Sequence, residues 1–176
     1  MKILSVDWAF HKTGLALYDS EKETIITWVY TIKDTVKIYW WNQKFYEWYI
    51  KHLRYMILQN AGFNADKILV EVGFGRVDKM SLFYAWFYGE WWKWQKVEFI
   101  NSSTWIKDML KVNHVNKLKK NQDKQLLKEQ FNKRFNIVGD FTQDEIDAVM
   151  MLLWKYPNIK VKRVEKALYE KVDFVI

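Results

Sequence analysis

Three short strand-like runs crowd into the first 32 residues, and they constrain the fold more than any other feature. The runs are Lys2–Trp8, Thr13–Asp19 and Thr24–Ile32, the last of which is rich in β-branched and aromatic side chains. His11, Lys12 and Gly14 mark the connection between the first two runs. Strands joined by such short connections pair antiparallel, so the sequence predicts a three-stranded antiparallel meander at the start of the chain.

The middle of the chain alternates between helical and strand-like patterns. Apolar residues recur with a period near 3.6 over Trp40–Ala61, and Gly62 follows as a typical residue past a helix end. Lys67–Val72 reads as a buried strand, 79–93 as a strongly aromatic helix, and Lys96–Ile100 as a fifth strand. Such βα units, added to a meander, predict a mixed sheet with helices on both faces.

Only helices are expected after residue 100. Ser103 is expected to cap a helix that runs to about Leu110, and Asp123–Phe135 is predicted to be helical after a polar, basic connection. The run T-Q-D-E predicts a capping box that starts a helix over Thr142–Trp154, with Glu145 reaching back to Thr142. Pro157 should end this helix, and 160–172 is read as a last one.

The length of 176 residues, the 50% hydrophobic content and the single proline fit one domain with a sizeable core. We therefore expect an α/β fold with a five-stranded mixed sheet, in one domain that spans 1–176. Residues 156–176 are expected to form a helical extension of that domain.

Composition restricts the chemistry that the chain can perform. The absence of cysteine excludes disulfides and thiolate metal sites, and His11, His52 and His114 lack the spacing of metal ligands. The most apolar run, 82–94, is too short to span a bilayer, and the start of the chain reaches an acid too soon for a signal peptide. We expect a cytoplasmic protein whose metal site, if present, uses carboxylates and holds magnesium or manganese.

Four acids stand in contexts that are unusual for acids. Asp7 ends an apolar strand, Glu71 lies inside the run I-L-V-E-V, and Asp144 and Asp147 share one face of the helix after Thr142. Each has an ordinary explanation, such as a solvated strand end, a favourable place at a helix N-terminus or simple exposure. Glu98, in K-V-E-F-I, is a possible further acid.

The four acids are more informative together than singly. Parallel strands end at the same edge of a sheet, where ligands bind, and a helix packed on the sheet can add two more carboxylates there. Such a cluster repels itself unless divalent cations neutralise it, and two magnesium ions can clamp the oxygens of a transferring phosphoryl group. The pattern therefore predicts a two-metal phosphodiesterase.

Most of the excess positive charge lies in one stretch. Residues 107–134 hold nine Lys and Arg against three Asp and Glu, a net of +6 in a chain whose net charge is +7. A solvated helix face is the plain explanation, and contact with nucleic-acid phosphates is the functional one. The candidate phosphate-binding residues are Lys107, Lys111, Lys117, Lys119, Lys120 and Lys124.

Three motifs in order resemble those of RuvC-type Holliday junction resolvases, which belong to the RNase H-like superfamily. I-L-S-V-D-W-A-F-H-K-T-G resembles the first motif, I-L-V-E-V-G-F the second and D-E-I-D-A-V the last, across residues 1 to about 155. Trp8 and Ala9 depart from the Pro-Gly that usually follows the first Asp, and the aromatic content is unusually high. These departures suggest a divergent branch, such as a phage or viral resolvase.

The resemblance implies roles for particular residues. Asp7, Glu71, Asp144 and Asp147 would be the catalytic acids and would hold two Mg²⁺ or Mn²⁺ ions. Phe74 would stack on bases at the junction centre. Lys107 and either Lys119 or Lys120 would lie near the scissile phosphate; the similarity favours neither lysine of that pair, and Lys120 is our choice. The resemblance also implies a homodimer acting on branched DNA, with the 82–94 helix at its interface, in a bacterial or phage-infected cytoplasm.

Three other functions remain open from the sequence. Another RNase H-like nuclease, such as an RNA–DNA hybrid ribonuclease or an integrase, would use the same acids, although the spacings Glu-x-x-Phe and D-x-x-D-A favour the resolvase. An actin-like or sugar-kinase-like ATPase needs glycine-rich loops, and six glycines argue against it. A non-catalytic junction-binding protein would have no use for four buried acids.

Overall fold

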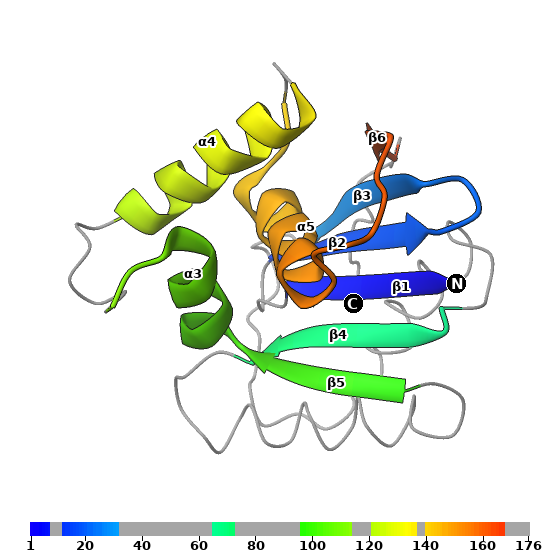
Figure 1. Cartoon of the computed structure of the whole chain (residues 1–176), viewed down its shortest axis with the longest axis horizontal. Helices are drawn as coiled ribbons and strands as arrows, with labels where there is room; N and C mark the ends of the chain where they lie inside the picture. Colours follow the sequence, from blue (N-terminus) through cyan, green and yellow to red (C-terminus); the bar gives the residue numbers. More distant parts are fainter. Residues whose placement is uncertain (8–11, 32–64, 73–95, 114–120, 137–139, 168–176) are drawn as a thin grey trace, which may run out of the picture.

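The computed structural model describes residues 1–7, 12–31, 65–72, 96–113, 121–136 and 140–167. In these residues one six-stranded sheet has the order β5-β4-β1-β2-β3-β6 (Figure 1). The five strands predicted from the sequence are all present. They are β1 (Lys2–Asp7), β2 (Lys12–Asp19), β3 (Thr24–Thr31), β4 (Lys67–Val72) and β5 (Lys96–Asn101).

The sheet is mixed, as expected. β1 pairs antiparallel with β2, and β2 with β3, which confirms the meander. On its other side β1 pairs parallel with β4, and β4 pairs parallel with β5. Because these three strands run in one direction, their carboxyl ends lie at one edge of the sheet, where α3 begins (Figure 1).

The helix predicted over 160–172 is wrong where the structure describes that segment. Residues Arg163–Lys166 form the sixth strand, β6, which pairs parallel with β3 over Thr24–Thr27. Backbone bonds from Lys162 N to Glu23 O and from Ala167 N to Thr27 O extend the pairing at both ends. The edge of β3 therefore determines the conformation of Arg163–Lys166. As a strand this segment pairs with the backbone N–H and C=O groups of β3, whereas a helix would leave those groups without hydrogen bonds.

Three helices follow the predicted order, with one corrected cap. They are α3 (Ser102–Leu110), α4 (Gln122–Phe135) and α5 (Gln143–Lys155). The cap of α3 is Asn101 and not Ser103, because the Asn101 side chain accepts the bond from Ser103 N while its own backbone stays extended. The capping box of α5 is confirmed, with Thr142 as the cap and Glu145 reaching back.

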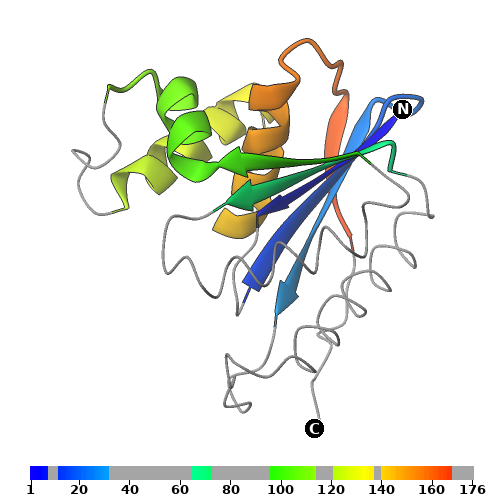
Figure 2. The same cartoon turned by 90° about the horizontal axis from the view of Figure 1, so that it is seen from below.

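The core lies between the sheet and α5. The predicted apolar stripe of α5, made of Ile146, Val149, Met150 and Leu153, is buried, and it packs with residues of β1 to β5. Figure 2 shows α3, α4 and α5 on the same side of the sheet. The helices predicted for 40–61 and 79–93, and with them the prediction of helices on the other face of the sheet, lie outside the described residues.

Among the described helices, each is too short or too polar to cross a membrane.

Candidate active site

Strand alternation turns Asp7 and Glu71 toward α5. Successive side chains of a strand point to opposite faces, and Ile3 of β1 and Leu69 of β4 both belong to the core beneath α5. Asp7 lies an even number of residues from Ile3, and Glu71 an even number from Leu69. Both acids therefore point to the face of the sheet that α5 covers. The two acids also stand side by side, because each directly follows a residue of the paired couple Val6 and Val70.

Gly14 brings the start of α5 down onto these acids. Gly14 pairs with Asp7 across β1 and β2. A Cβ atom built on Gly14 would lie 1.9 Å from the backbone oxygen of Asp144. Only a glycine leaves room for this contact, so Gly14 allows the first turn of α5 to lie directly over the strand that neighbours Asp7.

The first two turns of α5 contribute two carboxylates to the same place. Asp144 and Asp147 are three residues apart, which puts them on one side of the helix. Gln143 Nε2 donates a hydrogen bond of 2.7 Å to Asp147 Oδ1, which fixes that side chain from within the helix. The sequence analysis did not identify Gln143, although its spacing of four residues from Asp147 is the available signal.

Burial raises the pKa of all four acids, and repulsion by a neighbouring acid adds to the effect in each case. The pKa of Asp7 is well above its ordinary value because of desolvation, then the charge of Glu71 and a hydrogen bond with it, then Asp144. Burial raises the pKa of Glu71 to about 7, with Asp147 adding to the shift while hydrogen bonds from Asp7 and Ser102 act against it. Burial and the neighbouring Asp7 raise the pKa of Asp147 to about 8.

Asp144 is less buried, and its pKa is raised chiefly by desolvation. The charges of Lys12 and Lys124 act in the opposite direction. The four acids thus interact as one cluster, although they come from three separate segments of the chain. Groups of this kind, desolvated and of like charge, are typical of functional sites because a protein interior seldom tolerates them without a counter-ion.

The donor set of the cluster fits a hard divalent cation. Carboxylate oxygens are the ligands that Mg²⁺ and Mn²⁺ prefer. Burial is the largest cause of the raised pKa of all four acids, and it disfavours their charged form, which a bound divalent cation would stabilise. Within the described residues, however, no three His, Asp or Glu side chains already form a cage around a single position. The cluster therefore fits a divalent cation in the chemistry and charge of its ligands, and not through a preformed cage.

Among the described cations, Lys124 acts on the largest number of the four acids. It lies exposed on α4, and its charge lowers the pKa of Asp7, Asp144 and Asp147. Sequence analysis placed Lys124 among the DNA-binding lysines but not at the acids. Lys12, which acts on Asp144, was not predicted at all; its position two residues before Gly14 is the signal that could have found it.

The other predicted site residues are not brought to the acids by the described structure. Lys107 and Lys111 lie exposed at the end of α3. Glu98 belongs to a different contact, since it pairs with Lys155 at the far end of α5. The remaining candidates lie outside the described residues, namely Phe74, Lys117, Lys119 and Lys120.

Comparison with solved structures relates this fold to known proteins. Thermus thermophilus RuvC in complex with a Holliday junction substrate matches with a TM-score of 0.54 at 9% identity, over 89% of this chain and 95% of that chain. A second Thermus thermophilus RuvC structure matches with a TM-score of 0.52 at 9% identity, over 88% and 94% of the two chains. A complex of the Fowlpox virus resolvase with Holliday junction DNA has a TM-score of 0.43 at 17% identity, over 92% and 89%.

No protein-family model and no curated protein matches the sequence. At such low identities to the solved structures, the likeness is one of fold. The chain has the RNase H-like fold of the RuvC-type resolvases that its motifs resemble.

Proposed function

We propose that the protein is a structure-selective endonuclease that cleaves four-way DNA junctions by phosphodiester hydrolysis dependent on two divalent metal ions. The observation that carries this proposal is the cluster of four partly buried acids from β1, β4 and α5, whose pKa values burial raises. The cluster lies at the carboxyl ends of parallel strands, where α/β sheets bind ligands. The fold shared with RuvC supports the same reading.

In this proposal Asp7, Glu71, Asp144 and Asp147 hold Mg²⁺ or Mn²⁺. Bound divalent ions would polarise the scissile phosphate and stabilise the charge that develops on it. Gln143 holds the Asp147 carboxylate in place through its hydrogen bond. Lys124 of α4, whose charge lowers the pKa of three of the acids, would attract a phosphate toward the cluster and offset its negative charge.

The exposed cations of α3 and α4 extend the proposed DNA-binding surface away from the acids. They are Lys107, Lys111, Lys124, Lys128, Lys133 and Arg134. Such cations hold a nucleic acid by its backbone and position it without reading sequence. One of the matching structures is a complex of RuvC with a Holliday junction, and we propose branched DNA as the partner of this chain too.

Two further parts of the proposal come from the motif resemblance. Phe74 stacks on an unpaired base near the cut, which would favour distorted junction DNA over regular duplex. The protein acts as a homodimer, because two symmetric cuts in a four-way junction require two active sites related by a two-fold axis.

A cleavage assay on a panel of substrates tests the proposed function. Equal amounts of four-way junction, flap, duplex and RNA–DNA hybrid are incubated with the protein and Mg²⁺ or Mn²⁺, or with a chelator. We expect two symmetric cuts in the four-way junction, none with the chelator, and little cleavage of duplex. Preferred cleavage of the hybrid would replace the proposal with a ribonuclease, and binding without any cleavage would replace it with a junction-binding protein.

A further inference from the structure

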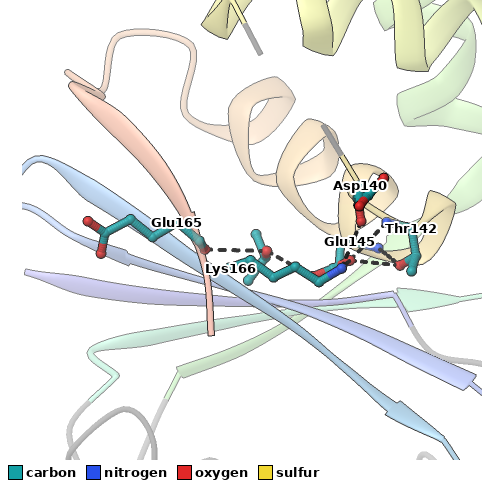
Figure 3. Close-up of polar contacts among 6 residues, drawn as sticks. Asp140, Thr142, Glu145, Glu165 and Lys166 are labelled. Atoms are coloured by element: carbon teal, nitrogen blue, oxygen red, sulfur yellow. Dashed lines mark hydrogen bonds and ion pairs between the residues drawn. The ribbon is translucent and has the colours of Figure 1, made fainter. Parts of the chain in front are cut away.

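Glu145 is a completely buried carboxylate that the proposed chemistry does not use. It lies in the sequence of α5 between Asp144 and Asp147, and its side chain contacts residues of β3 and β6 (Figure 3). Thr27 of β3 donates a hydrogen bond of 3.0 Å to Glu145 Oε1. Thr142 donates to Oε2 through its backbone N–H at 2.8 Å and through its hydroxyl at 3.0 Å. A carboxylate with so many donors is held in one position.

Lys166 of β6 closes this arrangement from the other side. Its Nζ lies 3.5 Å from Glu145 Oε2 and donates a hydrogen bond of 2.7 Å to the backbone oxygen of Asp140 (Figure 3). Lys166 thereby ties the segment before α5 to the edge of the sheet. The Lys166 side chain is 46% exposed, so water screens part of the attraction, whereas the Glu145 end is fully buried.

This contact is more than an ordinary capping box. A capping box needs only the cap residue and the glutamate three positions later, and it is complete here with Thr142 and Glu145. The additional partners, Thr27 and Lys166, come from two strands that lie far away in the sequence. They fix the first turn of α5 against the sheet, which a capping box alone cannot do.

The turn is held on two sides. Gly14 of β2 lies against the backbone of Asp144, while Thr27 and Lys166 hold the side chain of the next residue, Glu145. Because a helix turn is stiff, these two contacts determine where the carboxylates of Asp144 and Asp147 lie relative to Asp7 and Glu71.

We propose that Glu145, Thr27 and Lys166 are positioning residues of the active site, which set the distance between the acids of α5 and those of the sheet. The inference rests on the proposed function and adds to it that β6, through Lys166, takes part in forming the metal site. The three residues act through the position of α5 and touch neither the phosphate nor the metal ions.

Substitutions at two positions, Thr27 and Lys166, test this inference. Thr27→Val keeps the size of a fully buried side chain but removes the donor to Glu145 Oε1. Lys166→Met removes the cation at Oε2, and Lys166→Arg retains it. Lys162→Met is the matched control. It removes a lysine just before β6 whose Nζ lies 2.7 Å from Glu23 Oε2, in an ion pair away from Glu145.

The readouts are the single-turnover cleavage rate of a four-way junction, its dependence on Mg²⁺ concentration, and the Kd for the junction. Misplacing reacting groups by about 1 Å costs on the order of a hundredfold in rate. We expect Thr27→Val and Lys166→Met to slow cleavage by about tenfold or more at saturating junction. Both should need more Mg²⁺ for half-maximal rate, with unchanged Kd for the junction. Lys166→Arg should recover most of the rate, and Lys162→Met should behave as the wild type.

Results that would overturn this inference can be told apart from results that would overturn the proposed function. Wild-type rates and Mg²⁺ dependence for Thr27→Val and Lys166→Met, at a temperature below their melting points, would overturn the inference. A loss confined to Lys166→Met, with weaker junction binding, would also overturn it and make Lys166 a DNA contact. If the wild type cleaves no substrate, the proposed function fails. The affinity of the free proteins for Mn²⁺ then decides the inference: weaker binding by Thr27→Val supports it, and equal binding refutes it.

Discussion

The first two turns of α5 carry two kinds of carboxylate, and they differ in what surrounds them. Glu145 accepts hydrogen bonds from Thr27 and Thr142 and pairs with Lys166, so its charge is balanced by the protein itself. Asp147, two residues later, has Gln143 as a hydrogen-bond donor, but burial and the charges of Asp7 and Asp144 raise its pKa in spite of the charge of Lys124.

This difference separates a structural acid from a functional one. Burial alone does not mark a site, because Glu145 is the more deeply buried of the two. The distinguishing property is whether the chain provides the compensating charge. Where it does, the carboxylate fastens the helix to the sheet; where it does not, the carboxylates are ready to take a charge from solution. Five predictions test this contrast, from the largest expected effect to the smallest.

Removal of one acid from the uncompensated cluster should have the largest effect. Asp7→Asn or Glu71→Gln deletes a metal ligand in our proposal while it preserves size, so we expect junction cleavage to fall by about a thousandfold or more. Junction binding should persist or tighten, because one negative charge near the DNA is gone. Single-turnover cleavage and a binding titration measure the two effects.

Glu98→Gln is the matched control for these variants. Glu98 lies on β5, next to β4, but pairs with Lys155 and takes no part in the cluster. It should retain near-normal cleavage. Near-normal cleavage by Asp7→Asn would remove the cluster from the chemistry, and equal losses in all three variants would point to a general loss of structure.

Gly14→Ala should displace the start of α5 and so disturb the acid cluster. The new methyl group would overlap the backbone oxygen of Asp144, which lies 1.9 Å from its position, so the first turn of α5 must move away from Asp7. Overpacking of this kind costs about 1–3 kcal/mol of stability. We expect the melting temperature to fall and cleavage to fall further than the loss of folded protein explains. Unchanged cleavage by the folded fraction would show that the close approach of α5 is dispensable.

The stability of the metal-free protein should decrease as pH rises. The pKa of Glu71 is raised to about 7 and that of Asp147 to about 8, whereas both groups titrate near pH 4 in an unfolded chain. Between these limits the folded state binds more protons, so the free energy of unfolding falls with increasing pH. Urea unfolding at about pH 5 and about pH 8 measures this, and Asp147→Asn should flatten the dependence.

Divalent ions should reverse this loss of stability. Millimolar Mg²⁺ added near pH 8 should raise the free energy of unfolding of the wild type, because ligands that bind only the folded state stabilise it. The gain should be much smaller in Asp147→Asn. A pH profile that is flat without metal would contradict the repulsion within the cluster.

Neutralising a single lysine should have the smallest effect. Lys124→Met removes the cation beside the acids, and Lys128→Met removes an exposed cation one turn further along α4. Each contact with a phosphate contributes a slope of about one to the dependence of log K on log salt. We expect both variants to reduce the slope by no more than this, with only Lys124→Met also slowing cleavage. Equal cleavage rates would assign Lys124 to binding alone.

Much of this architecture was predictable because its signals are local. The strands of the meander, the capping box at Thr142 and the apolar stripe of α5 each depend on residues within a few positions of one another. The four acids were identifiable for a related reason: Asp7 and Glu71 stand at the end of and inside apolar strands, and Asp144 and Asp147 are three residues apart near the start of a helix.

The features that escaped prediction depend on contacts distant in sequence. β6 was assigned as a helix because its pairing with β3 joins segments about 140 residues apart in the chain, which no local period reveals. Glu145 was recognised as part of a capping box, but its bonds to Thr27 and Lys166 depend on how the sheet is assembled. The proximity of Lys124 to the acids has the same origin, because α4 reaches them only through the packing of three helices.

The binding of Mn²⁺ to the acid cluster tests the central claim of the account most directly. The electron paramagnetic resonance signal of free Mn²⁺ is followed during a titration of the wild type, of Asp7→Asn and of Glu98→Gln, near pH 8. We predict that the wild type and Glu98→Gln bind two ions per chain, and that Asp7→Asn loses at least one of them. Saturable binding that Asp7→Asn leaves unchanged, or no binding by the wild type, would contradict the claim that these four acids form a metal site.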